Sequence, residues 1–103
     1  MNKEQLLAKS NRGLDYYLLV FNHYNIPLKR KSKYQFKNTL NPFYNDTSKG
    51  FSIYFNKKQN IWYFKDFGTD EWGNEYGGDV FNFVALYHGK DVNQDFVEIL
   101  SLM

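Results

Sequence analysis

The sequence contains no cysteine, only two prolines, and no continuous apolar run of the roughly 18 residues that would span a membrane. Without cysteine, the chain forms neither a disulfide framework nor a thiolate metal site. The N-terminal residues lead into an amphipathic rather than a continuously apolar segment, so we expect no signal peptide. These absences favour a cytoplasmic protein with no membrane association.

The length of 103 residues predicts a single domain, residues 1–103, without linkers, repeats or low-complexity tracts. Aromatic residues are abundant instead, at 20% of the chain, which is more than a core of this size usually uses. Some of these rings are therefore expected to have a role outside the core.

The net charge of +2 conceals a strong asymmetry along the chain. Residues 29–65 contain nine basic residues and one acidic residue, whereas residues 66–103 contain one basic and eight acidic residues. Such polarity predicts one face that attracts a polyanion and another that repels it. The alternative is that charges segregated in the sequence mix again in the folded chain.

A helix with a core-facing stripe is predicted from Leu14 onward. The apolar residues at helical spacing are Leu14, Tyr17, Leu18 and Phe21. Leu19 and Val20 broaden this stripe, and Pro27 ends the helix because proline cannot continue the backbone hydrogen bonds. Residues 3–9 form either a short helix or a frayed lead-in, and both alternatives stay open.

An antiparallel sheet of three or more strands is predicted from alternating patterns. Residues 34–37 and 51–55 alternate apolar and polar side chains, and residues 61–64 form a second aromatic strand. The polar residues 56–60 between the last two strands predict a hairpin. The aromatic content of these strands favours cross-strand packing.

Two helices are predicted after the sheet. The first opens at Gly77–Asp79, with Asp79 as its N-cap, and is largely apolar until Gly89 ends it. The second starts near Asn93 and carries apolar residues at helical spacing.

The segment Asn41–Ile53 reads N-P-F-Y-N-D-T-S-K-G-F-S-I. It resembles the first motif of the zinc-binding domain at the N-terminus of DnaG-type DNA primases of bacteria and phages, which reads roughly C-P-F-H-N-E-K-T-P-S-F-S-V. The identical positions are Pro42, Phe43, Asn45, Phe51 and Ser52. The family's second motif, C-F-G-C followed by Gly-Gly-Asp, falls on Asp66–Thr69 and Gly77–Asp79. The resemblance extends from about Leu14 to about Leu100.

This resemblance places the family's four zinc ligands at Asn41, Tyr44, Asp66 and Thr69. Zinc is bound by thiolate, imidazole or carboxylate groups, and only Asp66 supplies one of these. We therefore expect no metal and no cofactor, as in zinc-less primase-like proteins of mobile elements and phages, whose W-Y-D-F-G run is similar to Trp62–Gly68. Hydrogen bonds among the four side chains, together with nearby phenylalanines, are expected to replace the metal. These phenylalanines are Phe43, Phe51, Phe64 and Phe67.

Together these patterns predict an α+β domain. A small antiparallel sheet of zinc-ribbon-like topology is expected, flanked by an N-terminal helix and two C-terminal helices. No catalytic residue is predicted, because the serines lie in unrelated contexts and the two histidines are isolated. The resemblance implies that nucleotide chemistry belongs to a separate catalytic domain, to which nothing in this chain corresponds. We expect a binding protein rather than an enzyme.

The basic block predicts binding of a single-stranded nucleic acid, because cations follow the phosphates while bases stack on aromatic rings. The candidate cations are Lys29, Arg30, Lys31, Lys33, Lys49, Lys57 and Lys58. Tyr54 and Trp62 are the candidate stacking residues, with core packing as the alternative for each. The resemblance implies single-stranded template DNA as the partner, within a primase-like replication protein.

Two other functions stay open. The chain is otherwise a protein-interaction module that docks to a replicative helicase or a primase catalytic domain, or an inhibitor of replication that mimics part of a primase. A contiguous basic patch across the sheet favours DNA, whereas an exposed apolar patch favours a protein partner.

Overall fold

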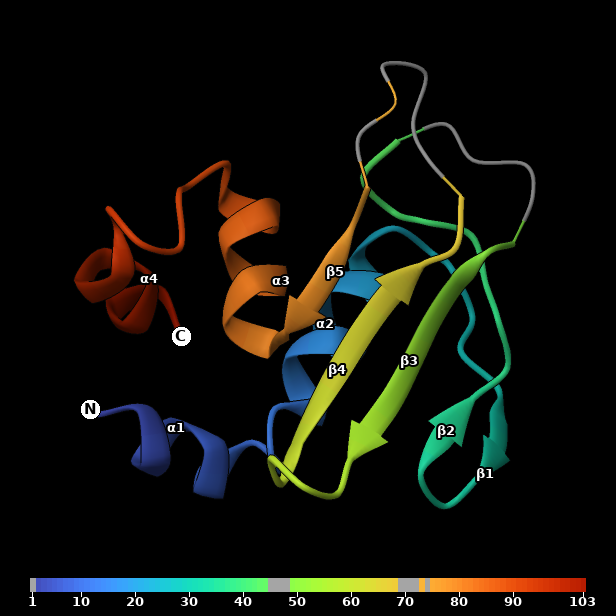
Figure 1. Ribbon diagram of the computed structural model, residues 1–103, viewed down its shortest axis with the longest axis horizontal. Coiled ribbons are helices and arrows are strands. Elements are labelled where there is room, and N and C mark those ends of the chain that lie inside the picture. Colours follow the sequence, from blue (N-terminus) through green and yellow to red (C-terminus); the bar gives the residue numbers. More distant parts are fainter. Residues whose placement is uncertain (1, 45–48, 69–72, 74) are drawn as a thin grey trace.

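The computed structural model describes residues 2–44, 49–68, 73 and 75–103. Within these residues, two helices are followed by five strands and two more helices (Figure 1). The helices are α1 (Lys3–Lys9), α2 (Leu14–His23), α3 (Val80–His88) and α4 (Phe96–Leu102). The strands are β1 (Arg30–Ser32), β2 (Gln35–Phe36), β3 (Phe51–Asn56), β4 (Ile61–Asp66) and β5 (Gly77–Asp79). The predicted α+β class, with helices before and after an antiparallel sheet, is confirmed.

The five strands form one antiparallel sheet whose spatial order is the sequence order, β1-β2-β3-β4-β5. In the central pair, the register of β3 and β4 places Ile53 opposite Phe64 and Phe55 opposite Trp62. The predicted hairpin between these strands is confirmed. A turn over residues 57–60 closes it, with Asn60 in the left-handed region at φ 56°.

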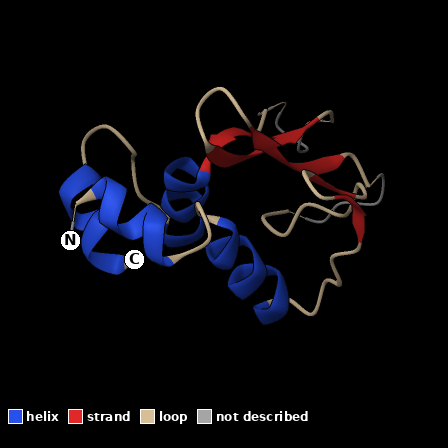
Figure 2. Cartoon of the chain, turned by 90° about the horizontal axis from the view of Figure 1, so that it is seen from below, coloured by secondary structure: helices blue, strands red, loops and turns tan. Residues whose placement is uncertain are grey.

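The core lies between one face of the sheet and the helices α2 and α3, which lie on that side (Figure 2). Tyr17 of α2 contacts Phe64 with ring centroids 6.2 Å apart, and its hydroxyl donates to the carbonyl of Trp62 at 2.9 Å. Phe83 of α3 lies 5.4 Å from Phe64 and 6.3 Å from Phe51. Phe51, on the apolar side of the alternating pattern of residues 51–55, is completely buried.

The structure corrects the predicted apolar stripe of α2. The buried residues of this helix are Leu14, Tyr17, Val20 and Phe21. Leu18 and Leu19 are instead exposed, at 41% and 64%. The prediction that both face the core is wrong, because the sheet and α3 cover one side of α2 only. Successive helical residues are rotated by about 100°, so these two leucines turn away from the covered side.

Residues 3–9 form the short helix α1, one of the two alternatives that the sequence left open. A capping box begins it: Asn2 Oδ1 accepts a hydrogen bond from the backbone amide of Gln5 at 2.9 Å, and Gln5 Oε1 accepts one from the backbone amide of Asn2 at 3.0 Å. Arg12 then connects α1 to the β3–β4 turn. Its guanidinium donates to Glu4 at 2.6 Å and to the carbonyl of Asn60 at 2.8 Å.

Asp79 is the N-cap of α3, as predicted. Its Oδ1 accepts hydrogen bonds from the backbone amides of Phe81 at 2.9 Å and Asn82 at 3.1 Å. Gly89 ends the helix in the left-handed conformation at φ 64°, also as predicted. Residues 77–79, however, do more than open the helix. They form the strand β5, which pairs with β4 and completes the sheet.

The last helix begins later than predicted. Residues 91–95 form a turn in which Asp91 Oδ1 accepts hydrogen bonds from the backbone amides of Asn93 and Gln94, both at 2.8 Å. α4 then starts at Phe96 and buries Ile99 completely. No helix in the described part of the chain is long and apolar enough to cross a membrane.

Candidate nucleic-acid interface

Three of the four residues at the zinc-ligand positions are joined by hydrogen bonds. Asp66, the last residue of β4, accepts on Oδ2 from Asn41 Nδ2 at 2.9 Å and from the Tyr44 hydroxyl at 2.7 Å. Its Oδ1 accepts from the backbone amide of Gly68 at 2.9 Å. Thr69, the fourth position, lies outside the described residues. We call Asp66, Asn41 and Tyr44 the Asp66 cluster.

The donor set of the Asp66 cluster does not fit a zinc ion. Asp66 is its only carboxylate, and a carboxamide and a phenol replace the thiolates or imidazoles that zinc prefers. The carboxylate is 3% exposed and receives donors on both oxygens. Among the described residues, no three His, Cys, Asp or Glu side chains come together as a metal site. Hydrogen bonds hold residues 41–44 against the end of β4, as a structural metal would join two segments.

The phenylalanines near this cluster divide into two groups. Phe51 and Phe64 are completely buried, and Phe43 is half-buried against the core. Phe67 is 70% exposed, so the prediction that it fills the volume beside the cluster is wrong. Asp66 points inward at the end of β4, and the next side chain therefore turns outward. There the ammonium group of Lys65 lies 5.4 Å from the centroid of the Phe67 ring.

The charge asymmetry of the sequence persists in the sheet. Because the strand order follows the sequence order, β1, β2 and β3 occupy one side of the sheet, and β5 lies at the other edge, next to α3 (Figure 1). In the described part of residues 16–65, there is no acidic residue. The next acid, Asp66, is buried. Phosphates that approach from the β1–β3 side therefore meet lysine and arginine without a competing carboxylate on those strands.

The β1–β2 and β3–β4 hairpins meet at Tyr34. The backbone amide of Phe55 donates to the carbonyl of Tyr34 at 2.7 Å, and the two rings stack with centroids 5.6 Å apart. The ammonium groups of Lys57 and Lys33 lie 4.3 Å and 5.5 Å from the centroid of the Tyr34 ring. The Tyr34 ring is partly open to solvent, at 38% exposure. We call Tyr34, Lys33 and Lys57 the Tyr34 cluster.

Of the predicted contact residues, Trp62 lies in the core, whereas Arg30 stays exposed on β1 and also packs against the edge of the core. Trp62 is 5% exposed because its side chain lies on the core face of β4, and the prediction that it stacks on a base is wrong. The guanidinium of Arg30 lies 4.7 Å from the ring centroid of Phe36 and 5.5 Å from that of Trp62. Arg30 also donates to the carbonyl of Lys33 at 2.8 Å. It therefore covers the edge of the core and holds the β1–β2 turn.

Tyr54 lies on the opposite face of the sheet, half-buried beside Tyr63, with ring centroids 6.1 Å apart. The two tyrosines line a cleft of about 680 Å³ together with Lys65 and Phe67. Burial raises the pKa of Tyr63 above the ordinary value of 10.0. Glu75 lines the same cleft and makes that end less favourable for a phosphate.

Three further lysines line another cleft. Lys29 and Lys49, both predicted contacts, line it together with Lys37, which is not among the predicted contacts. We call this cavity, with its three lysines, the lysine cleft. Lys31 on β1 and Lys58 in the β3–β4 turn, the other predicted cations, are exposed.

Sequence reasoning also missed Tyr34 as a stacking residue. The available signal was an aromatic residue in the run Lys31-Ser32-Lys33-Tyr34, at the end of a polar turn. This position looks like the first residue of a strand in the alternating pattern. Only the contact with the second hairpin indicates a binding surface.

No family model, curated protein or solved structure matches this chain. The likeness to the zinc-binding domain of DnaG-type primases therefore depends on the two sequence motifs alone.

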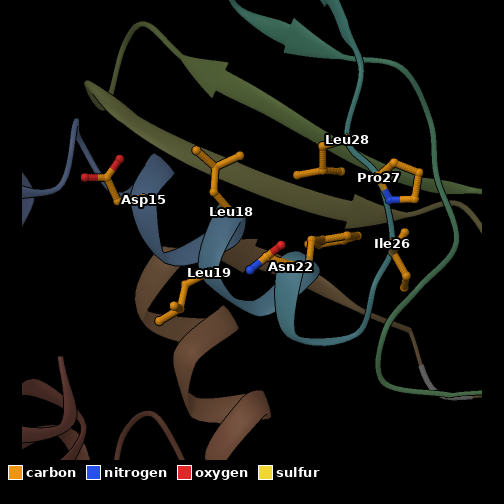
Figure 3. A pocket seen from close by; sticks show the side chains of 8 residues that line it. Asp15, Leu18, Leu19, Asn22, Ile26, Pro27 and Leu28 are labelled. Atoms are coloured by element: carbon orange, nitrogen blue, oxygen red, sulfur yellow. The ribbon is translucent and has the colours of Figure 1, made fainter.

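An apolar groove on the uncovered side of α2 is the other surface of note (Figure 3). Leu18 and Leu19 of α2 line it together with Ile26 and Leu28 from the connection to β1, and Asp15 lies at one end. The groove has a volume of about 570 Å³. Exposed apolar surfaces of this kind are typical of contacts between proteins.

Proposed function

We propose that this chain binds single-stranded template DNA as a non-catalytic, zinc-less module of a primase-like replication protein of a mobile element or phage, in the cytoplasm. The observation that carries the proposal is the separation of charge across the sheet. The described residues from 16 to 65 carry lysine and arginine without an acid, whereas most of the described acids lie at or beyond the end of β4. A polyanion is therefore attracted to one side of the molecule.

The Tyr34 cluster supplies both kinds of contact that a single strand needs. Lys57 and Lys33 come from different hairpins and lie over one ring, where their ammonium groups are available to neighbouring phosphates. The partly exposed Tyr34 ring is supported from below by Phe55, and a base stacks on such a ring after the flexible lysines move aside. Tyr54 on the other face is the second candidate for stacking.

The test is a titration of a labelled single strand at several salt concentrations. For each phosphate contact on a single strand, the log–log slope of affinity against salt is about −0.7. Lys57→Gln should make the slope shallower by about this amount and weaken binding to all sequences alike. Tyr34→Ala should cost about 1–3 kcal/mol of affinity while the slope stays unchanged.

Lys9→Gln is the matched control, since Lys9 is an exposed lysine on α1, outside the basic block. It removes the same charge but should leave the slope and the affinity nearly unchanged. The proposal is abandoned if single strands do not bind at low salt. It is also abandoned if Lys57→Gln and Lys9→Gln have the same effect.

A second candidate function is docking to a primase catalytic domain or a replicative helicase, and the groove on α2 favours it. Leu19 is 64% exposed although it is strongly apolar. Leu18→Ser combined with Leu19→Ser should abolish co-elution with such a partner and leave binding of single strands unchanged. An inhibitor that mimics part of a primase would use the same groove, but it would bind the partner without binding DNA.

A further inference from the structure

Three segments of the chain meet at the lysine cleft, which has a volume of about 410 Å³. Lys29 comes from the connection between α2 and β1, Lys37 follows β2, and Lys49 precedes β3. All three side chains are exposed, and Asn38 and Thr39 also line the cleft. None of the described residues that line the cleft is acidic.

Backbone hydrogen bonds fix the positions of these segments. The backbone amide of Lys37 donates to the carbonyl of Lys29 at 2.8 Å, which joins the first two segments. Thr39 and Phe51 exchange two backbone hydrogen bonds, at 2.9 and 3.0 Å, and this bridge holds the segment of Lys49 beside Thr39. The three lysines are therefore brought to one cleft by paired backbone and not by chance contacts of flexible side chains.

This arrangement concentrates positive charge, and no carboxylate among the described residues forms an ion pair with it. Within the described residues, the ion pairs are Arg12 with Glu4 and Lys90 with Glu98, so no carboxylate there pairs with the lysine cleft. Three ammonium groups around one cleft repel one another, and an anion between them removes that repulsion. Lysine binds phosphate as a point charge, and the polar side chains of Asn38 and Thr39 offer hydrogen bonds to its oxygens.

We propose that the lysine cleft is a phosphate-binding site, with Lys29, Lys37 and Lys49 as the ligands of one phosphate group. The phosphate is either an internal phosphodiester of a bound single strand or the terminal phosphate of a strand or nucleotide. If the phosphate is an internal phosphodiester, the site is part of the proposed DNA-binding surface, and this inference then rests on the proposed function. If it is a terminal phosphate, binding at this site does not require the Tyr34 cluster.

The test compares wild type with Lys37→Gln, which keeps most of the side-chain length and removes the charge. Lys9→Gln is the matched control, and thermal unfolding checks that each variant is folded. Two single strands of the same sequence, with and without a 5′-phosphate, are titrated. Loss of one charge-assisted contact should weaken binding about tenfold in Lys37→Gln and not in Lys9→Gln.

A loss with both strands identifies an internal phosphodiester. A loss confined to the 5′-phosphorylated strand identifies a terminal phosphate. The inference is overturned if Lys37→Gln binds both strands as Lys9→Gln does.

A second measurement separates this inference from the proposed DNA binding. Inorganic phosphate is titrated at constant ionic strength while the backbone amide resonances of Asn38 and Thr39 are followed. These resonances should move in wild type and in Tyr34→Ala, and Lys37→Gln should need about tenfold more phosphate for the same shift. If single strands fail to bind and phosphate still moves the resonances, the DNA proposal fails and the phosphate site stands. If phosphate leaves these resonances unchanged in wild type, the site is not a phosphate site.

Discussion

Asp66 is a buried carboxylate, and a buried carboxylate is costly unless several donors surround it. Its two oxygens accept from Asn41, Tyr44 and the backbone of Gly68, at 2.7–2.9 Å. These donors come from two separate segments of the chain, so the hydrogen bonds also hold the segments together. At the scale of single residues, the Asp66 cluster is therefore a structural unit.

Removing a donor or the acceptor of the Asp66 cluster should lower the free energy of unfolding. Tyr44→Phe loses one hydrogen bond to a charged group and should cost about 1.5–3 kcal/mol. Asp66→Ala removes the common acceptor and should cost at least about 3 kcal/mol. Urea denaturation gives both values. Tyr24→Phe, at an exposed tyrosine outside the cluster, is the control and should change little. Equal effects in Tyr44→Phe and Tyr24→Phe would contradict this role.

Tyr17 predicts a dependence of stability on alkaline pH. Burial, followed by the negative charge of Asp79, raises the pKa of the Tyr17 hydroxyl well above its ordinary value of 10.0. The unfolded chain therefore loses this proton first as the pH rises. The stability that Tyr17 contributes is present in full below about pH 10 and decreases above it.

The comparison with Tyr17→Phe isolates this effect, because the other tyrosines and the lysines titrate in both proteins. Wild type should be the more stable protein at pH 8, through the hydrogen bond to the carbonyl of Trp62. The difference in unfolding free energy should shrink above pH 10. A difference that stays constant from pH 8 to pH 11 would show that Tyr17 is not the titrating group.

At the scale of elements, the junction between β5 and α3 is the most constrained. Gly78 has φ 141°, and a Cβ at this position would lie 2.5 Å from Asn82 Oδ1. Asn82 cannot easily move, because this same oxygen accepts a hydrogen bond from the backbone amide of Asp79 at 3.0 Å. Strand pairing and helix capping thus meet at one glycine.

Gly78→Ala should destabilise the protein by about 3 kcal/mol or more, since backbone strain and a steric clash act together. Gly89, at the other end of α3, is the matched control. It also has positive φ, at 64°, but an added Cβ there meets nothing within 4 Å. Gly89→Ala should cost only about 1–2 kcal/mol. Thermal unfolding of the two variants compares them directly, and equal losses would show that the contact with Asn82 does not matter.

At the scale of the whole molecule, aromatic packing supports the fold around the zinc-ligand positions. Phe83 contacts Phe51, Phe64 and Phe21 within one cluster of rings, with centroids 5.4–6.3 Å apart. Full burial of each phenylalanine contributes roughly 1.5–3 kcal/mol. A structural zinc contributes on the order of 10–16 kcal/mol, so several buried rings and the Asp66 cluster together are of comparable size.

The protein should therefore keep its fold when metals are removed. We expect the same melting temperature before and after treatment with excess chelator, and no stoichiometric zinc in the purified protein by elemental analysis. Phe51→Ala should instead lower the free energy of unfolding by about 3–5 kcal/mol. Unfolding on addition of chelator would contradict this account.

Local patterns in the sequence determined much of the fold. The alternation in residues 51–55 and 61–64 predicts β3, β4 and their hairpin, because side chains of a strand point to opposite faces in turn. Asp79 and Gly89 predict both ends of α3. Asp79 accepts hydrogen bonds from the free backbone amides of the first turn, and Gly89 readily adopts the left-handed conformation that ends a helix. The motif positions also predict that Asn41, Tyr44 and Asp66 lie together. These features depend on neighbours in the chain or on a quoted motif.

Contacts between distant segments determined the features of the fold and of the candidate site that local patterns do not predict. Leu19 has the same local pattern as a core residue, but it is exposed because no described element covers that side of α2. Trp62 is buried because β4 is paired in a register that points it inward, opposite Phe55. Tyr34 and Lys37 become candidate contacts only when β3 brings a second segment beside each of them. Sequence periodicity reports only on residues that are neighbours in the chain. The candidate site is formed by residues far apart in the chain, which strand pairing and packing bring together.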